Sequence, residues 1–194
     1  MDKNLLYFGD NLEILRGRIG DESVDLIYLD PPFNSKANYN VLFREEDGSR
    51  PVSQVKAFVD TWEWNQESSS TYFSFIESAD TPEQARKALI AMHDLLGGRG
   101  KIGNGMIAYL SMMAPRLVEL HRVLKPTGSI YLHCDPTASH HLKLLMDSIF
   151  RPQNFRNEII WRRTGTHGPR RSFGPVHDTM MMSRPRRRNK SSSR

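Results

Sequence analysis

The sequence predicts an α/β fold with a mainly parallel β-sheet. Short apolar runs of strand length alternate along the chain with stretches whose apolar residues recur at helical spacing. The run at 24–29 is nearly all apolar without alternation, which is typical of a parallel strand buried on both faces. Ligands of such sheets bind beyond the carboxyl ends of the strands, where this sequence places two polar turns.

The first strand, turn and helix are expected at the start of the chain. Residues 4–8 are apolar and end at Gly9-Asp10, which indicates a strand followed by a turn. Asp10 is suited to cap a short helix predicted over 11–19. The apolar run at 24–29 is the next predicted strand.

The middle of the chain, residues 34–105, is polar and less regular, and we expect an irregular insertion there. One helix inside it is predicted after Thr81, which can act as a cap with Gln84 at the return position of a capping box. Gly97 would end this helix. The glycine-rich stretch 97–105 follows a helix and not a strand, so we expect a flexible loop rather than a cofactor loop.

Strand and helix alternate again in the second half of the chain. Helical spacing predicts a helix over 106–124, which Pro115 should kink or restart. A strand at 129–134 and an amphipathic helix at 139–150 follow. A further short strand is expected at 158–161.

Positive charge is concentrated at the end of the chain. The net charge is +5, yet residues 184–194 contain five Arg, one Lys and no acidic residue. The preceding residues therefore carry a net charge of −1, and total charge is weak support for a nucleic-acid surface. We expect one domain over 1–182 and a basic, disordered tail over 183–194.

Cysteine content and hydropathy indicate a cytoplasmic protein. Cys134 is the single cysteine, so no internal disulfide can form and a reducing compartment fits. No apolar run reaches the length of about 18 residues that a membrane span needs. The start of the chain also lacks the basic and apolar regions of a secretion signal.

The turn at 30–33 has the residue types needed to activate an exocyclic amino group of a nucleobase. The lone pair of that nitrogen is delocalised into the ring, so two acceptors are needed to aim it at an electrophilic methyl group. Asp30 supplies one acceptor and the Pro31 carbonyl a second, while Pro32 stiffens the turn. Phe33 offers a flat face on which an extruded base can stack.

The alternative for this segment is a plain turn, because Asp and Pro are common turn residues. Three features of the context favour the functional interpretation. They are the apolar strand before the turn, the aromatic in its fourth place, and the Gly-Asp turn upstream after another apolar run.

Four stretches of the sequence resemble the β class of adenine and cytosine amino-methyltransferases of DNA. They are Gly9-Asp10, Asp-Pro-Pro-Phe at 30–33, PRLVELHRVLKPTGSIYLHCD at 115–135 and NEIIWR at 157–162. The resemblance covers roughly residues 4–182 and implies a Rossmann-like fold that binds S-adenosylmethionine.

The same resemblance implies roles for individual residues. Gly9, Asp10 and Asp30 would contact the cofactor, and Asp10 would meet its adenine. The four residues at 30–33 would be catalytic. Asp in the first position resembles the adenine-specific members, so adenine N6 is favoured over cytosine N4 as the methylated atom.

The sequence departs from the family pattern towards its end. A target-recognition region and a strand ending in Phe-x-Gly-x-Gly are expected there, and neither is present. After 177–179 the resemblance implies an apolar strand, yet three Met and then the basic run follow. We therefore expect a chain left incomplete by a frameshift or an early stop, with a genuine phosphate-binding tail as the alternative.

A group of potential metal ligands lies close together in the sequence. Its members are His133, Cys134, Asp135, His140 and His141. Strand alternation and helical spacing point them in several directions, so structural roles are favoured and no metal site is expected.

Four arginines are candidates for contacts with DNA phosphates, with a solvated loop as an equal alternative. They are Arg162, Arg163, Arg170 and Arg171. The three tryptophans, Trp62, Trp64 and Trp161, are expected to anchor the core rather than to stack on bases.

The leading functional hypothesis is a site-specific DNA methyltransferase of a restriction-modification system. It would flip a base out of double-stranded DNA, with a restriction subunit or a second copy of the chain as a partner. One alternative is an inactive remnant that only binds DNA or a partner. Another is a methyltransferase that acts on RNA or on side-chain amides of proteins.

Overall fold

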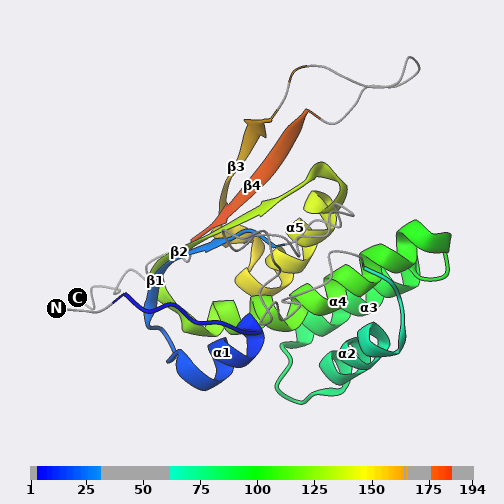
Figure 1. The fold of residues 1–194 in the computed structure, drawn as a ribbon, viewed down its shortest axis with the longest axis horizontal. Coiled ribbons are helices and arrows are strands. Elements are labelled where there is room, and N and C mark those ends of the chain that lie inside the picture. Colours follow the sequence, from blue (N-terminus) through cyan, green and yellow to red (C-terminus); the bar gives the residue numbers. More distant parts are fainter. Residues whose placement is uncertain (1–3, 32–61, 164, 166–175, 185–194) are drawn as a thin grey trace, which may run out of the picture.

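The computed structural model describes residues 4–31, 62–163, 165 and 176–184 (Figure 1). Within these ranges the chain forms helices and strands in the following order. They are α1 (Asn11–Arg18), β1 (Val24–Leu29), α2 (Gln66–Glu77), α3 (Glu83–Leu96), α4 (Gly100–Val123), β2 (Leu124–Cys134), α5 (Pro136–Phe150), a 3-10 turn (Pro152–Asn154), β3 (Phe155–Arg162) and β4 (His177–Ser183).

The strands form one mixed sheet in the order β1-β2-β4-β3. β1 pairs with β2 in parallel, whereas β4 pairs antiparallel with both β2 and β3. The expected mainly parallel sheet is therefore wrong for the described strands. The physical reason is that β4 follows β3 along the chain and returns beside it, and antiparallel neighbours need no crossover helix.

Strand β4 occupies a segment where the sequence analysis placed no strand. Its residues, HDTMMMS, include a single β-branched side chain and show little strand preference. The strand has hydrogen-bonded neighbours on both sides, and this pairing overrides the weak local preference. Ser183 ends β4, so the strand crosses the expected boundary between domain and tail, and residues 185–194 lie outside the described part.

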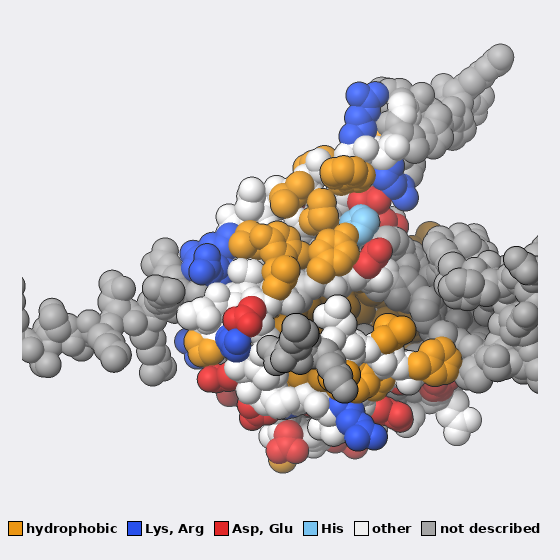
Figure 2. All heavy atoms as spheres, turned by 60° about the vertical axis from the view of Figure 1, so that its left-hand side comes forward, with side chains coloured by type: hydrophobic (Ala, Val, Ile, Leu, Met, Phe, Trp, Pro, Cys, Tyr) orange, Lys and Arg blue, Asp and Glu red, His pale blue; other side chains and the backbone are white. Residues whose placement is uncertain are grey.

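The described helices cover one face of the sheet, and none of them covers the other, which is called the open face below. Ile130, Leu132 and Met181 lie on the covered face and are buried in one core with residues of α4 and α5. Leu26 and Tyr28 point to the opposite face and are 60% and 57% exposed. Figure 2 shows hydrophobic side chains gathered on this side of the molecule. The expectation that β1 is buried on both faces is wrong, because no described helix covers its second face.

Helix α4 is the centre of the helical layer, and α1, α2, α3 and α5 all contact it. It continues through Pro115 without restarting. It also includes residues 100–105, so the flexible loop expected at 97–105 is wrong for that part. Glycine is needed there because a Cβ on Gly103 would collide with the carbonyl oxygen of Leu96. The helix can therefore begin directly against the end of α3.

Two local predictions near the helix starts have different outcomes. Asp10 caps α1, since its Oδ1 accepts from the N–H of Leu12 at 2.7 Å, as expected. Thr81 does not cap α3, whose first residue follows Pro82 without a side-chain cap. Residues 4–8 form no strand and their apolar side chains are exposed, so the expected first strand is wrong.

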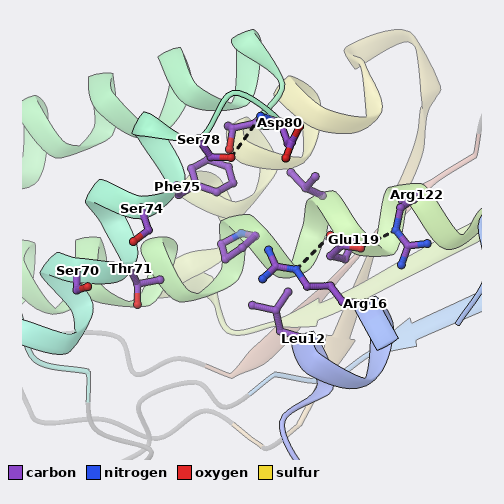
Figure 3. A pocket seen from close by; sticks show the side chains of 13 residues that line it. Leu12, Arg16, Ser70, Thr71, Ser74, Phe75, Ser78, Asp80, Glu119 and Arg122 are labelled. Atoms are coloured by element: carbon purple, nitrogen blue, oxygen red, sulfur yellow. Dashed lines mark hydrogen bonds and ion pairs between the residues drawn. The ribbon is translucent and has the colours of Figure 1, made fainter. Parts of the chain in front are cut away.

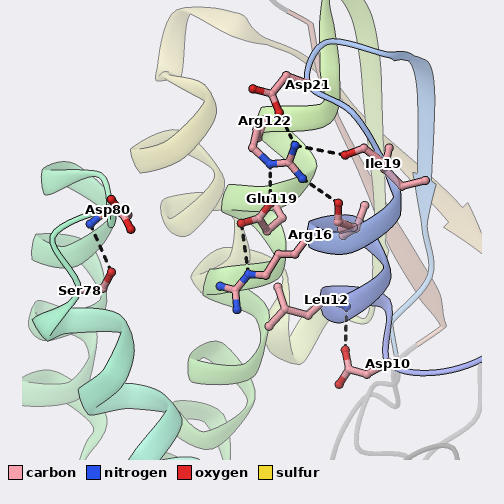
Figure 4. A network of polar contacts seen from close by, with 10 residues as sticks. Asp10, Leu12, Arg16, Ile19, Asp21, Ser78, Asp80, Glu119 and Arg122 are labelled. Atoms are coloured by element: carbon pink, nitrogen blue, oxygen red, sulfur yellow. Dashed lines mark hydrogen bonds and ion pairs between the residues drawn. The ribbon is translucent and has the colours of Figure 1, made fainter.

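A network of polar contacts fixes α1 and the start of β1 to α4 (Figure 4). The guanidinium of Arg122 donates to the carbonyl oxygens of Leu15 and Ile19 at 2.7 and 3.2 Å, and it also contacts Asp21. Its Nε donates to Glu119 at 2.6 Å. These contacts hold the turn that leads into β1, and β1 in turn places the residues that follow it.

Candidate functional site

Asp30 follows the last residue of β1 and projects from the open side of the sheet. Its side chain is 56% exposed, whereas Pro31 is buried. The other two members of the predicted catalytic turn, Pro32 and Phe33, lie outside the described residues. An exposed carboxylate followed by a buried proline gives one solvent-facing acceptor on a fixed backbone, as the chemistry proposed from the sequence requires.

His133 of β2 lies beside Asp30. The parallel register pairs Leu29 with Leu132, so the next residue of each strand points to the open face at the same level. The Nδ1 of His133 is 3.2 Å from Oδ1 of Asp30 and 3.3 Å from the hydroxyl of Tyr28. The Nδ1 side of the imidazole therefore contacts both the predicted catalytic carboxylate of Asp30 and the hydroxyl of Tyr28.

Asp178 of β4 lies on the opposite edge of the same imidazole. Its Oδ2 is 3.3 Å from Nε2 of His133, and its Oδ1 is 3.2 Å from Nε of Arg163. The Asp178 side chain is only 5% exposed. A buried carboxylate is costly unless cations or donors face it, and here a guanidinium and an imidazole do so.

Arg163 is held in place through its backbone as well. Its N–H donates to the carbonyl oxygen of Val176 at 2.9 Å, one residue before β4 begins. Of the four arginines predicted to meet phosphates, Arg163 is thus engaged with Asp178 and Arg162 is exposed on β3. Arg170 and Arg171 lie outside the described residues.

The Gly9-Asp10 turn has a well-defined structure of its own. Gly9 has a φ of +136°, a backbone conformation that glycine adopts far more readily than other residues. Both oxygens of Asp10 accept from Nη2 of Arg116, at 2.9 and 2.6 Å, besides the capping bond to α1. Burial lowers the pKa of Arg116, and the contacts with Asp10 oppose that shift. Asp10 remains half-exposed, so its Oδ2 keeps room for one further donor.

The second half of the chain is similar in sequence to a known protein family. Residues 99–193 match the family model described as DNA methylase. This range contains β2 and β4, and with them His133 and Asp178, as well as Arg163. This chain belongs to the DNA methylase family.

Relatives of this DNA methylase family chain include subunits of restriction-modification enzymes. The chain is 30% identical to the Mod subunit of the type III enzyme StyLTI of Salmonella typhimurium, over 82% of this chain and 20% of that protein. It is 24% identical to the type II methyltransferase M.KpnI of Klebsiella pneumoniae, over 91% of this chain and 31% of the relative. It is also 24% identical to the EcoP15I Mod subunit of Escherichia coli, over 86% and 22%. The chain therefore spans about a fifth to a third of the length of the curated relatives it matches.

A cleft in the described part of this DNA methylase family chain does not include Asp30. It has a volume of about 780 Å³ and lies between α1, α2 and α4 (Figure 3). Ser70, Thr71 and Ser74 of α2 face Leu12 and Arg16 of α1 across it. The Nε of Arg16 is 3.3 Å from Glu119, so this cation already has a carboxylate partner. The cleft is consequently a gap between helices and not part of the open sheet face.

Sequence reasoning missed the roles of His133 and Asp178 in this arrangement. His133 was considered as a metal ligand together with Cys134, but alternation places the two on opposite faces of β2, and Cys134 is buried. The same alternation puts His133 on the face of Tyr28 once the β1–β2 register is known. Asp178 carried no signal, because it lies in a strand that the sequence did not reveal.

The tryptophans divide into two groups. Trp62 and Trp64 pack against the buried core, as expected. Trp161 is exposed on β3, so its expected role as a core anchor is wrong. It pairs in register with Asp178, and its exposure follows from the open face that β3 shares with β1.

Proposed function

We propose that this chain carries the amino-group-binding part of a site-specific DNA methyltransferase. The chain belongs to the DNA methylase family, and its relatives include the modification subunits of restriction enzymes. The observation that carries the residue assignment is the solvent-facing Asp30 at the carboxyl end of β1, followed by the buried Pro31. Double-stranded DNA is the substrate, and adenine N6 is the preferred acceptor.

The chemistry assigned to Asp30 follows from its exposure and its position. One oxygen accepts a hydrogen bond from the amino group of a flipped base, which draws electron density onto the nitrogen and favours its attack on a methyl carbon. The carbonyl of Pro31 would accept from the second amino hydrogen, and Pro32 and Phe33 would stiffen the turn and support the base. As the N–C bond forms, the S–CH3 bond of S-adenosylmethionine would break and S-adenosylhomocysteine would leave. The amino nitrogen would carry a positive charge until it loses a proton to solvent, and the Asp30 carboxylate would stabilise that charge.

S-adenosylmethionine supplies the methyl group in this proposal. The residues assigned to it are Gly9, Asp10 and Asp30. The described structure fits this assignment at Asp10, because Oδ2 accepts a single bond from Arg116 and the side chain is half-exposed. That oxygen is free to accept from a donor on the adenine end of the cofactor. A restriction subunit is the proposed partner, by analogy with the Mod subunits.

The test is a methyl-transfer assay on the whole chain with labelled S-adenosylmethionine and duplex DNA. We expect wild-type protein to label DNA and Asp30→Ala to lose at least about 100-fold in rate, because a fixed electrostatic contact is removed. Asp25→Ala is the matched control, since Asp25 is an exposed carboxylate on the same strand that pairs with Lys125. Digestion of the product to nucleosides then distinguishes N6-methyladenine from N4-methylcytosine.

Two results would contradict the proposal. An Asp30→Ala variant as active as Asp25→Ala would remove Asp30 from the reaction. If the wild-type chain binds duplex DNA tightly but transfers no methyl group, its function would be DNA binding and not catalysis.

A further inference from the structure

We propose that His133 and Asp178 position Asp30, so that an otherwise mobile surface carboxylate is held in one orientation for the target amino group. This inference rests on the proposed function of Asp30. His133 would be a positioning residue and would not touch the base.

The three side chains come from three adjacent strands. Asp30 follows β1, His133 belongs to β2 and Asp178 belongs to β4, which is the next strand in the sheet. All three point to the open face, where Nδ1 of His133 is 3.2 Å from Asp30 and Nε2 is 3.3 Å from Asp178. A row of side chains across paired strands has its spacing set by the sheet itself.

The exposed fraction of the side chain increases along this row, from Asp178 through His133 to Asp30. The side chains of Asp178, His133 and Asp30 are 5%, 18% and 56% exposed. A half-exposed aspartate without a partner would sample several rotamers, and ordering it costs conformational entropy. Contact with a ring that is itself fixed against a buried carboxylate removes much of that freedom before substrate arrives.

Asp178 can serve as an anchor because its charge is compensated on its far side. Arg163 lies 3.2 Å from Oδ1, which leaves Oδ2 facing His133. The backbone N–H of Arg163 donates a hydrogen bond to the carbonyl oxygen of Val176, immediately before β4. This bond fixes the position of Arg163 relative to Asp178, which lies on β4. The imidazole of His133 therefore lies between two carboxylates, one near each of its ring nitrogens.

A metal site is a poorer account of the same residues. The two carboxylates contact different nitrogens of the imidazole, one on each edge of the ring. One ion cannot bind both carboxylates and a ring nitrogen of His133 when the ring lies between them. Among the described residues, no group of three such side chains converges on a point suited to a metal ion.

The kinetic test compares ring substitutions at His133 with the same change at His140. His133→Phe keeps a ring but removes both nitrogens, and His133→Gln restores one donor; His140 is exposed on α5 and serves as the control. We expect His133→Phe to lower kcat by about 10- to 100-fold, because a small misplacement of a reacting group has effects of this size. The KM for DNA should change less than kcat, and His133→Gln should recover part of the rate.

A second measurement needs no catalysis. In a double-mutant cycle, the folding equilibrium constants of Asp30→Asn, His133→Phe and the double variant are compared by urea unfolding. Contacting residues should show coupling of at least about twofold in the equilibrium constant, whereas Asp25→Asn with His133→Phe should show none. The corresponding cycle of Asp178→Asn with His133→Phe should also show coupling.

The outcomes separate this inference from the proposed function. If Asp30→Ala is inactive while His133→Phe has the kcat of His140→Phe, the positioning role is overturned and the function stands. If neither cycle shows coupling, the row of contacts itself is overturned. An active Asp30→Ala variant, or a wild-type chain without methyl transfer, would overturn both proposals together.

Discussion

The Nη2 atom of Arg116 lies 2.9 Å from Oδ1 and 2.6 Å from Oδ2 of Asp10, so a side chain of α4 holds the carboxylate that caps α1. The same guanidinium donates to Asn11 at 2.8 Å and to the carbonyl oxygen of Met112 at 2.9 Å. Four acceptors therefore meet one partly buried cation, and the start of α1 cannot move away from α4 without breaking these bonds.

Replacing Arg116 with Ala should lower the free energy of unfolding. The loss should be about 1–3 kcal/mol, because Asp10, Asn11 and Met112 would lose a charged donor in a partly buried setting. Urea unfolding followed by circular dichroism measures the change. Lys87→Ala is the control, since its ion pair with Glu83 is exposed to solvent and should contribute much less to stability. Equal losses in the two variants would show that the contacts of Arg116 with the start of α1 do not stabilise the fold.

Local patterns predicted the position of Asp30 but not its surroundings. The apolar run at 24–29 and the Asp-Pro-Pro-Phe segment after it are adjacent in sequence, so the strand and its turn could be read directly. The approach of His133 depends on the parallel register of β1 with β2, about 100 residues away in the chain. The approach of Asp178 depends on β4, whose pairing overrides weak strand preference.

Burial was harder to predict than element type. Leu26 and Tyr28 have the composition of a strand buried on both faces, but composition cannot reveal whether a helix covers the second face. The glycines at 100–105 signal flexibility when taken alone, and the close approach of α4 to the end of α3 explains them instead. In both cases the deciding contact comes from another part of the chain.

Gly103→Ala should destabilise the chain although alanine is the better helix former. A Cβ at this position would collide with the carbonyl oxygen of Leu96, which is backbone and cannot rotate away. We expect a loss of about 1–3 kcal/mol, the usual size of a steric overlap in a packed interior. Gly20→Ala, where an added Cβ meets nothing within 4 Å, should change stability much less. A Gly103→Ala variant as stable as wild type would show that α3 and α4 are less closely packed than described.

The Cys134 thiol should be nearly inert in the folded chain. Burial, followed by the nearby Asp135, raises its pKa to about 12, so little thiolate exists at neutral or mildly alkaline pH. Because Cys134 is the single cysteine, labelling with a coloured disulfide reagent reports on this site alone. We expect the rate at pH 8 to be at least about 100-fold lower in folded than in urea-unfolded protein, since the thiolate is the reacting form. Rapid labelling of folded protein would mean that the covered face of β2 opens readily.

Stability should decline as the pH falls below about 6.5, the usual histidine range. Burial lowers the pKa of His141, and burial together with Arg151 lowers that of His121. The unfolded chain therefore takes up protons at a higher pH than the folded chain, so the stabilising difference is complete above this range and is lost as the pH falls through it. His141→Gln should make the decline in unfolding free energy shallower in urea titrations between pH 7 and 5. A slope in His141→Gln that equals the wild-type slope would show that His141 does not contribute to the decline.

Leucines on the two faces of the sheet should respond very differently to truncation. Leu132→Ala on β2 should cost about 2–5 kcal/mol, because the side chain is fully buried and a cavity would remain. Leu26→Ala on β1 should cost less than about 1 kcal/mol, since most of that side chain is already exposed to water. Both free energies come from urea unfolding at low protein concentration, and the loss in Leu26→Ala should not vary with concentration. A large, concentration-dependent loss in Leu26→Ala would instead mean that a second copy of the chain covers the open face beside Asp30 and His133.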